Sequence, residues 1–181
     1  PNPYFQDIRE AAASLGQGIP AAVDAGRGLR ILFVCEPLSE HGSREFGNER
    51  HWGYTEFDAL RYFFDHIKAL GKTADHVVVR PHPAEPAGKY GWVADEFGAH
   101  VTIGGKKTLL QEIAESDVVV GCESMAMVVG LIVGRRVICC IPPGGSDCTL
   151  PQPEIESLQD LVESQCKATG MTQRARKDNS A

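Results

Sequence analysis

Short apolar runs alternate along this chain with segments in which apolar residues recur every three or four positions. A continuous apolar run of about four to eight residues is typical of a strand that is buried on both faces of a parallel sheet. Five segments fit this description and are predicted as strands, namely 29–35, 76–79, 100–103, 117–120 and 137–141.

Helical periodicity fills most of the sequence between these strands. The segment 54–70 shows it best, because Leu60, Phe64 and Ile67 fall on one stripe and Gly71 follows the last turn, where glycine commonly ends a helix. Residues 36–53 are polar without a clear period and are predicted to form a long loop. The other segments with helical spacing are predicted as helices, namely 4–15, 90–97, 108–115, 124–133 and 154–166.

This alternation of strands and helices indicates an α/β fold, a three-layer Rossmann-like domain with a parallel sheet of about five strands. We assign the domain to residues 29–166. An N-terminal helix and linker over 1–28 precede it, and a tail over 167–181 that is predicted to be flexible follows it. Right-handed crossovers bring the carboxyl ends of all the strands to one edge of the sheet, where ligands bind in open α/β sheets.

Composition narrows the classes of protein that fit this fold. The 181 residues suffice for one domain, and the net charge of −6 at pH 7 gives no general attraction to nucleic acid or anionic lipid. No apolar stretch of about 18 residues and no signal peptide is visible, so we expect a cytoplasmic protein without a membrane span. None of the 6 cysteines forms a CxxC pair, which favours buried thiols over a metal or disulfide role.

The first candidate site follows the predicted strand 76–79, where the sequence reads Arg80-Pro-His-Pro83. A proline fixes its own φ at about −65° and favours an extended residue before it, so His82 is held in a stiff turn at the ligand-binding edge. A histidine there can hydrogen-bond a phosphate or a ribose, or exchange a proton near neutral pH. We predict that Arg80, His82 and Pro83 bind the ligand and that His82 is catalytic, with capping of the turn as the alternative role of its side chain.

The second candidate site, Gly121-Cys-Glu-Ser124, directly precedes a predicted helix. The free amides and the dipole at a helix N-terminus attract an anion, Ser124 adds a hydroxyl, and Gly121 permits a ligand to approach the backbone closely. Glu123 can hydrogen-bond the hydroxyls of a ribose or another sugar. An ordinary N-cap is the alternative role of Ser124.

Two further turns are expected at the same edge. Glu36 and Ser39 lie in the loop after the first strand, where phosphate-binding loops are common, but this loop lacks both GxGxxG and GxxxxGK[ST]. Gly104 begins the turn Gly104-Gly-Lys-Lys107 after the strand 100–103. A nucleotide base could lie against this turn, and a solvated basic loop is the favoured alternative. The absent motifs argue against a dinucleotide enzyme and a P-loop NTPase, and the absence of GxSxG argues against an α/β-hydrolase.

Taken together, these segments resemble a known family. From Tyr54-Thr-Glu56 through Arg80-Pro-His-Pro83 to Asp117-Val-Val-Val-Gly121 and Glu123-Ser124, the chain resembles the C-terminal, donor-binding half of GT-B glycosyltransferases. It is most similar to bacterial sialyltransferases and polysialyltransferases, capsule polysaccharide enzymes and CDP-glycerol glycerophosphotransferases. Those enzymes contact the donor phosphates with a His-Pro motif and a Ser/Thr pair at a helix start. His82 and Pro83 match the first motif, whereas Ser124 matches one member of the pair because Met125 replaces its neighbour.

The resemblance implies a nucleotide-sugar, or another CMP-, CDP- or UDP-type ligand, and a role in the synthesis of surface polysaccharides or glycoconjugates. A GT-B enzyme has two Rossmann-like halves with the active site between them, and its N-terminal half usually binds the acceptor. Because 181 residues have room for one half, we expect this chain to bind the ligand without catalysing transfer alone. Catalysis would need a missing N-terminal half or a partner chain.

Two alternative functions fit the same fold. Half of an enzyme like UDP-N-acetylglucosamine 2-epimerase would need extra carboxylates in the cleft, and Glu36, Glu85 and Glu123 are the suitably placed ones. A non-catalytic binding or assembly module would ignore every nucleotide, so a nucleotide titration separates it from the enzymes. A flavodoxin-like or response-regulator domain is disfavoured, because the acidic cluster expected after the first strand is absent.

Overall fold

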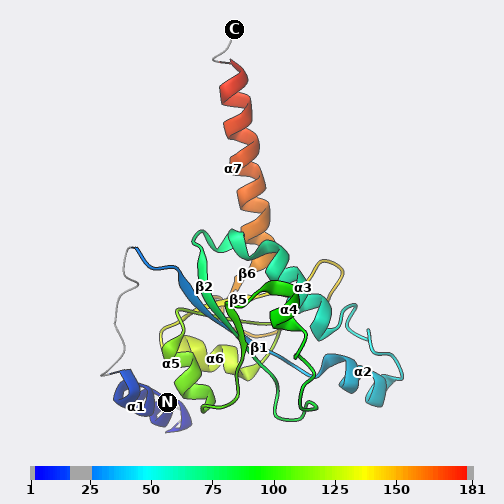
Figure 1. Cartoon of the computed structure of the whole chain (residues 1–181), viewed down its shortest axis with the longest axis vertical. Helices are drawn as coiled ribbons and strands as arrows, with labels where there is room; N and C mark the ends of the chain where they lie inside the picture. The colour runs from blue at the N-terminus through cyan, green and yellow to red at the C-terminus, as the bar shows by residue number, and fades with distance from the viewer. Residues whose placement is uncertain (1–2, 17–25, 179–181) are drawn as a thin grey trace.

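A computed structural model describes residues 3–16 and 26–178 of the chain. Within these residues, six parallel strands form one sheet in the order β3-β2-β1-β4-β5-β6 (Figure 1). This order confirms the predicted Rossmann-like α/β fold, with one strand more than the expected five. The strands are β1 (Leu29–Val34), β2 (Ala74–Arg80), β3 (Val101–Ile103), β4 (Val118–Gly121), β5 (Arg136–Cys139) and β6 (Glu156–Ser157).

The centre of the sheet is apolar on both faces, as the continuous apolar runs predict. Ile31 of β1 pairs with Val77 of β2 on one side and with Val118 of β4 on the other. All three side chains are buried. Burial on both faces explains why these strands show no alternation of apolar and polar residues.

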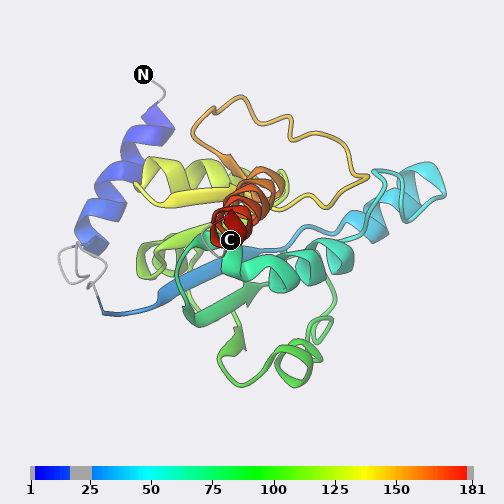
Figure 2. The same cartoon turned by 90° about the horizontal axis from the view of Figure 1, so that it is seen from above.

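Helices cover both faces of the sheet and complete the three layers (Figure 2). One face carries α3 (Glu56–His66), with the 3₁₀ turn η1 (Ile67–Leu70), α4 (Val93–Phe97) and the start of α7 (Leu158–Asp178). The ring centroids of Phe33 in β1 and Phe63 in α3 lie 5.4 Å apart on this face. The opposite face carries α5 (Leu109–Glu115) and α6 (Met125–Ile132), with α1 (Pro3–Gly16) packed against both.

Two elements differ from the sequence-based expectation. Helix α2 (Leu38–Phe46) lies within the segment predicted as a loop, and it projects beyond the edge of the sheet (Figure 2). Gly42 is the one buried residue of this helix, so the sequence has no apolar stripe that would predict it. The last helix was expected over 154–166, but α7 begins at Leu158 and continues to Asp178, so residues 167–178 of the expected tail are helical (Figure 1). Most of the expected linker, residues 17–25, lies outside the described residues.

None of the helices in the described ranges is long and apolar enough to cross a membrane.

Side-chain caps fix where two of the helices begin at the carboxyl edge of the sheet. At the start of α3, Thr55 N donates to Asp58 Oδ2 over 2.8 Å, and Asp58 N donates to Thr55 Oγ1. Thr108 and Gln111 form the same reciprocal pair at the start of α5. Such capping boxes satisfy amides that have no partner inside the helix, so they hold the loops before α3 and α5 in one conformation.

The close packing of side chains around the end of β4 can be tested by substitution. A Cβ atom at Gly121 would lie 2.8 Å from Val34 Cγ2 and 3.1 Å from Met127 Sδ. We therefore expect Gly121→Ala to lower the free energy of unfolding by about 1–3 kcal/mol, the usual cost of overpacking a core, as measured by urea denaturation. Gly26→Ala is the control, since nothing lies within 4 Å of its added carbon. Equal stability changes in the two variants would contradict the packing described here.

Candidate functional site

The strand order reverses at β1, which lies between β2 and β4, and the loops that follow these strands meet at the carboxyl edge. Glu36 directly follows β1 and its side chain reaches the loop after β4. Its Oε1 atom accepts hydrogen bonds from the amides of Cys122, over 3.2 Å, and Glu123, over 2.8 Å. The structure thus brings together two of the predicted site segments, the loop after β1 and Gly121–Ser124.

Glu36 occupies amides that we expected to receive the anion of a ligand. Burial raises the pKa of its carboxyl group above the ordinary value of 4.5, and the hydrogen bonds from Glu123 and Cys122 oppose this shift only in part. The carboxylate of Glu123 is close enough to raise the pKa further. It also fixes a later loop, because Glu123 Oε1 accepts a hydrogen bond from Thr149 N over 2.7 Å.

The remaining predicted residues of this segment have structural contacts of their own. Ser124 caps α6, since its hydroxyl accepts a hydrogen bond from Ala126 N over 3.2 Å. The structure therefore shows the alternative that the sequence left open, in which Ser124 is an ordinary N-cap. Gly121 is buried at the end of β4, where Val34 and Met127 leave no room for a side chain. Contact of either residue with a ligand stays a prediction.

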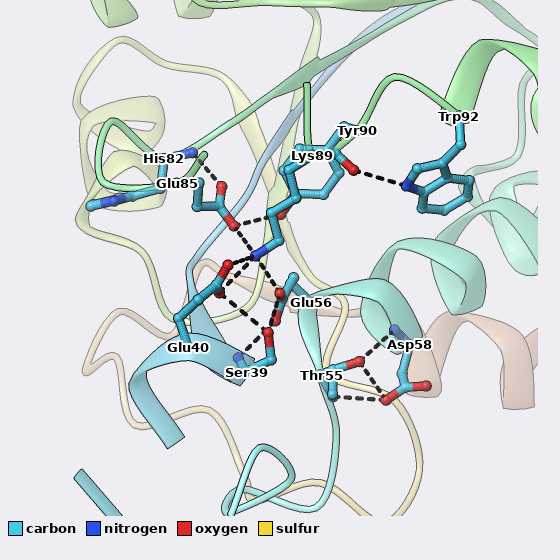
Figure 3. Close-up of polar contacts among 10 residues, drawn as sticks. All are labelled: Ser39, Glu40, Thr55, Glu56, Asp58, His82, Glu85, Lys89, Tyr90 and Trp92. Carbon is cyan, nitrogen blue, oxygen red and sulfur yellow. Dashed lines mark hydrogen bonds and ion pairs between the residues drawn. The ribbon is translucent and has the colours of Figure 1, made fainter. Parts of the chain in front are cut away.

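The turn that carries His82 is held by its own side chains. His82 N donates to Glu85 Oε2 over 2.7 Å, and His82 Nδ1 accepts a hydrogen bond from Ala84 N over 3.2 Å. Because Nδ1 is the acceptor, the neutral imidazole carries its proton on Nε2. The ring and Pro83 are exposed, and in Figure 3 the ring points away from the neighbouring carboxylates. His82 is thus fixed in a turn and presents an N–H donor to solvent.

A buried lysine lies beside this turn at the centre of three carboxylates. Lys89 Nζ is 2.7 Å from Glu40 Oε1 and 2.8 Å from Glu85 Oε1, and it also contacts Glu56 (Figure 3). We call these four residues the lysine–carboxylate cluster. Burial opposes the charge on the ammonium, but hydrogen bonds to the three carboxylates outweigh it and raise the pKa of Lys89. The carboxylate oxygens lie within 4.8 Å of one another, an arrangement that would suit a metal ion, and here it surrounds the ammonium.

The cluster connects three loops of the carboxyl edge. Ser39, after β1, donates to Glu56 at the start of α3 from its amide, over 2.8 Å, and from its hydroxyl, over 2.5 Å. Glu85 links the His82 turn to the same ammonium. The predicted ligand residue Ser39 is therefore engaged with Glu56. The sequence patterns did not indicate Lys89 as a site residue, although its spacing of four residues from Glu85 is visible in the sequence.

The other two predicted site residues lie around a different carboxylate, Glu112. Arg80 Nη1 donates to Glu112 Oε2 over 2.6 Å and to the carbonyl of Lys107 over 3.0 Å. A Cβ atom at Gly104 would lie 2.9 Å from the same Oε2 atom. Arg80 and Gly104 thus lie together beside α5, and among the described residues no hydrogen bond or ion pair joins either of them to His82.

Four cysteines gather behind the loop after β4. The Sγ atoms of Cys122 and Cys140 are 3.9 Å apart, and the thiols of Cys139 and Cys148 both lie against the Cys122 carbonyl. Cys139 and Cys140 are buried, as predicted for apolar runs, and Cys122 is buried as well. The expectation of buried thiols is wrong for Cys166, which is exposed, and Cys148 is half-buried. Burial raises the pKa of the Cys139 and Cys140 thiols, so these groups stay protonated and act as core residues.

Comparisons with known proteins give structural similarities at low sequence identity. No family model and no curated protein matches this chain. It is similar to Thermosulfurimonas dismutans KpsC, beta Kdo 2,4 transferase, with 16% identity over 87% of this chain and 50% of that chain, at a TM-score of 0.46. It is also similar to Thermosulfurimonas dismutans KpsC, beta Kdo 2,7 transferase, with 19% identity over 90% of this chain and 52% of that chain, at a TM-score of 0.44. The chain spans about half the length of the solved chains it matches.

Removal of the cluster's cation tests its contribution to stability. Lys89→Met would leave the buried carboxylates of Glu56 and Glu85 without their counter-ion, so we expect urea denaturation to show a loss of about 3–5 kcal/mol. Lys107→Met is the matched control, because Lys107 pairs with Glu115 and both side chains are about half exposed. That change should cost less than about 1 kcal/mol. Similar losses in the two variants would show that the cluster contributes no special stability.

The raised pKa of Glu36 makes a prediction about pH. Folded protein retains this proton to a higher pH than unfolded protein, so ionisation of Glu36 destabilises the fold as pH rises above about 4.5. Glu36→Gln removes the ionisation and keeps an acceptor for the two amides. We expect the melting temperature of the variant, relative to wild type, to increase between about pH 4 and pH 7. A difference that is constant or decreases over this range would contradict the proposed cause.

Proposed function

We propose that this domain binds a nucleotide-type ligand, the donor of a glycosyl transfer, in the crevice between the loops after β1, β2 and β4. The observation that carries the proposal is the pair of hydrogen bonds that the Cys122 and Glu123 amides donate to the Glu36 carboxylate, which joins two loops where the strand order reverses. Ligands of open α/β sheets bind in this crevice. The motif resemblance of His82-Pro83 and Ser124 to donor-binding halves of GT-B enzymes supports the same location.

His82 is the residue best suited to the phosphate of such a donor. Its turn is held by Glu85, and its Nε2–H group is exposed toward solvent. When the glycosyl bond breaks, negative charge grows on the leaving phosphate, and a fixed donor stabilises that charge better than mobile water does. A protonated His82 could also transfer its proton to the leaving group.

The carboxylates of the crevice suit the hydroxyl groups of the ligand. Glu36 already accepts hydrogen bonds from the amides of Cys122 and Glu123, so these amides are not free to hold a phosphate. Ionised carboxylates only accept hydrogen bonds, and ribose and sugar hydroxyls are donors of the right kind. In this proposal His82 and the Ser124 end of α6 face the phosphate, while Glu36 and Glu123 select the sugar part of the nucleotide.

The proposed activity is one half of a reaction in the synthesis of surface polysaccharide or glycoconjugate. We expect binding without transfer by this chain alone, because a second Rossmann-like half would have to bring the acceptor. The epimerase alternative is less well supported. It needs extra carboxylates in the cleft, and one of the three suitably placed ones, Glu85, is buried and bonded to Lys89, Tyr90 and the His82 amide.

Calorimetric titration with CMP, CDP and UDP tests the proposal. We expect at least one of them to bind, and His82→Ala to weaken that binding by about 1–3 kcal/mol, the range for a lost hydrogen bond to a charged group. His100→Ala is the control, since His100 is also exposed but precedes β3 at the opposite edge of the sheet. Equal affinity of the wild type and His82→Ala, or no binding of any of the three nucleotides, would refute the proposed site.

A further inference from the structure

A groove with no role in the proposed donor site runs past the lysine–carboxylate cluster. It consists of two adjoining hollows of about 590 and 390 Å³, which share Ser39, Glu49 and Phe57. Residues 86–89 form one wall of the larger hollow, and Trp92 lies at the far end of the smaller one. The shared lining makes the two hollows one continuous groove between α2, the start of α3 and the loop that carries His82.

The charges along this groove are paired in a way that leaves hydrogen-bond acceptors free. Lys89 is already surrounded by the three carboxylates of its cluster, and Arg50 pairs with Asp58 over 2.7 Å. The carboxylate of Glu49, in contrast, makes no hydrogen bond or ion pair with any described residue, and the same holds for the Ser43 hydroxyl. The groove therefore offers acceptors and a flexible hydroxyl but no unpaired cation to a ligand.

An aromatic ring forms the apolar part of the same lining. Phe57 is half-buried and belongs to both hollows, and its ring packs against Tyr90, with ring centroids 6.0 Å apart, and against Trp92, at 6.2 Å. The ring is held in place by these neighbours while one part of it stays accessible. A rigid apolar surface beside a few polar groups is the usual composition of a small-molecule site.

We propose that this groove binds a neutral carbohydrate. Sugar hydroxyls donate hydrogen bonds to Glu49 and exchange them with Ser43, and the C–H face of a sugar ring packs on Phe57. An anionic ligand is disfavoured, because the unpaired charge in the groove is negative. Residues 86–89 belong to the loop of His82, so the groove and the proposed donor site share this loop.

Chemical-shift mapping of the ¹⁵N-labelled chain tests the groove with glucose, galactose, N-acetylglucosamine, ribose and maltotriose at millimolar concentration. We expect at least one of these sugars to shift the amide resonances of Ser43, Glu49 and Phe57. Glu49→Gln replaces a charged hydrogen bond by a neutral one, so it should lower the affinity for that sugar about five-fold. Glu154→Gln removes the same charge at an exposed position outside the groove and should leave the affinity unchanged.

Two probes of opposite charge separate the carbohydrate from other ligands. Spermine tests for an amine or a basic peptide, and sialic acid tests for an anion. The proposal is overturned if no neutral sugar shifts the groove resonances, or if spermine or sialic acid shifts them and the sugars do not. A parallel titration with CMP keeps the two proposals apart. If a sugar shifts the groove resonances and CMP does not shift those of His82, the groove proposal stands and the donor-site proposal fails. If CMP shifts the His82 resonance and no sugar shifts those of the groove, the donor-site proposal stands and the groove proposal fails.

Discussion

The ammonium of Lys89, held among Glu40, Glu56 and Glu85, is the interaction on which the geometry of the carboxyl edge depends. Three carboxylates this close would repel one another, and the buried cation turns that repulsion into attraction. Each of the two buried carboxylates also accepts a hydrogen bond from a separate segment. Glu56 accepts one from the loop after β1, and Glu85 accepts one from the turn after β2. Segments far apart in the sequence thereby become one rigid wall, which is what a site needs to hold a ligand in a fixed position.

The electrostatics of this edge distinguish the domain from a general phosphate-binding fold. In many α/β proteins the amides after a central strand receive a ligand's phosphate, whereas here Glu36 occupies those of Cys122 and Glu123. The net charge of the chain is −6, and Lys89 beside this edge is paired with three carboxylates, so its ammonium is not free to bind a phosphate. The proposed site therefore relies on carboxylates for the hydroxyl groups of the ligand and on the exposed ring of His82 for its phosphate.

Sequence patterns predicted the large features of the fold because burial determines them. Apolar runs located five of the six strands, but β6 has two residues and both are half-buried, so it leaves no run to detect. Helix α2 was missed for a similar reason, since it buries Gly42 alone. The loops of the candidate site were placed at the right edge by topology. Their contacts were not predictable, because Lys89 meets Glu40 and Glu56 across long stretches of sequence and only the Glu85 spacing is local.

The same limit applies to the roles of the predicted site residues. Arg80 and Gly104 lie beside Glu112, and the position of the Arg80 guanidinium depends on which face its side chain takes at the end of β2. The central claim is that the crevice between the loops after β1, β2 and β4 binds a nucleotide. A crystal structure of the chain soaked with CMP tests it most directly. We expect the phosphate within hydrogen-bond distance of His82 Nε2 and the ribose against Glu36 or Glu123. CMP bound elsewhere, such as in the cavity of about 270 Å³ beside Val78 and Thr102, would show that this site is wrong.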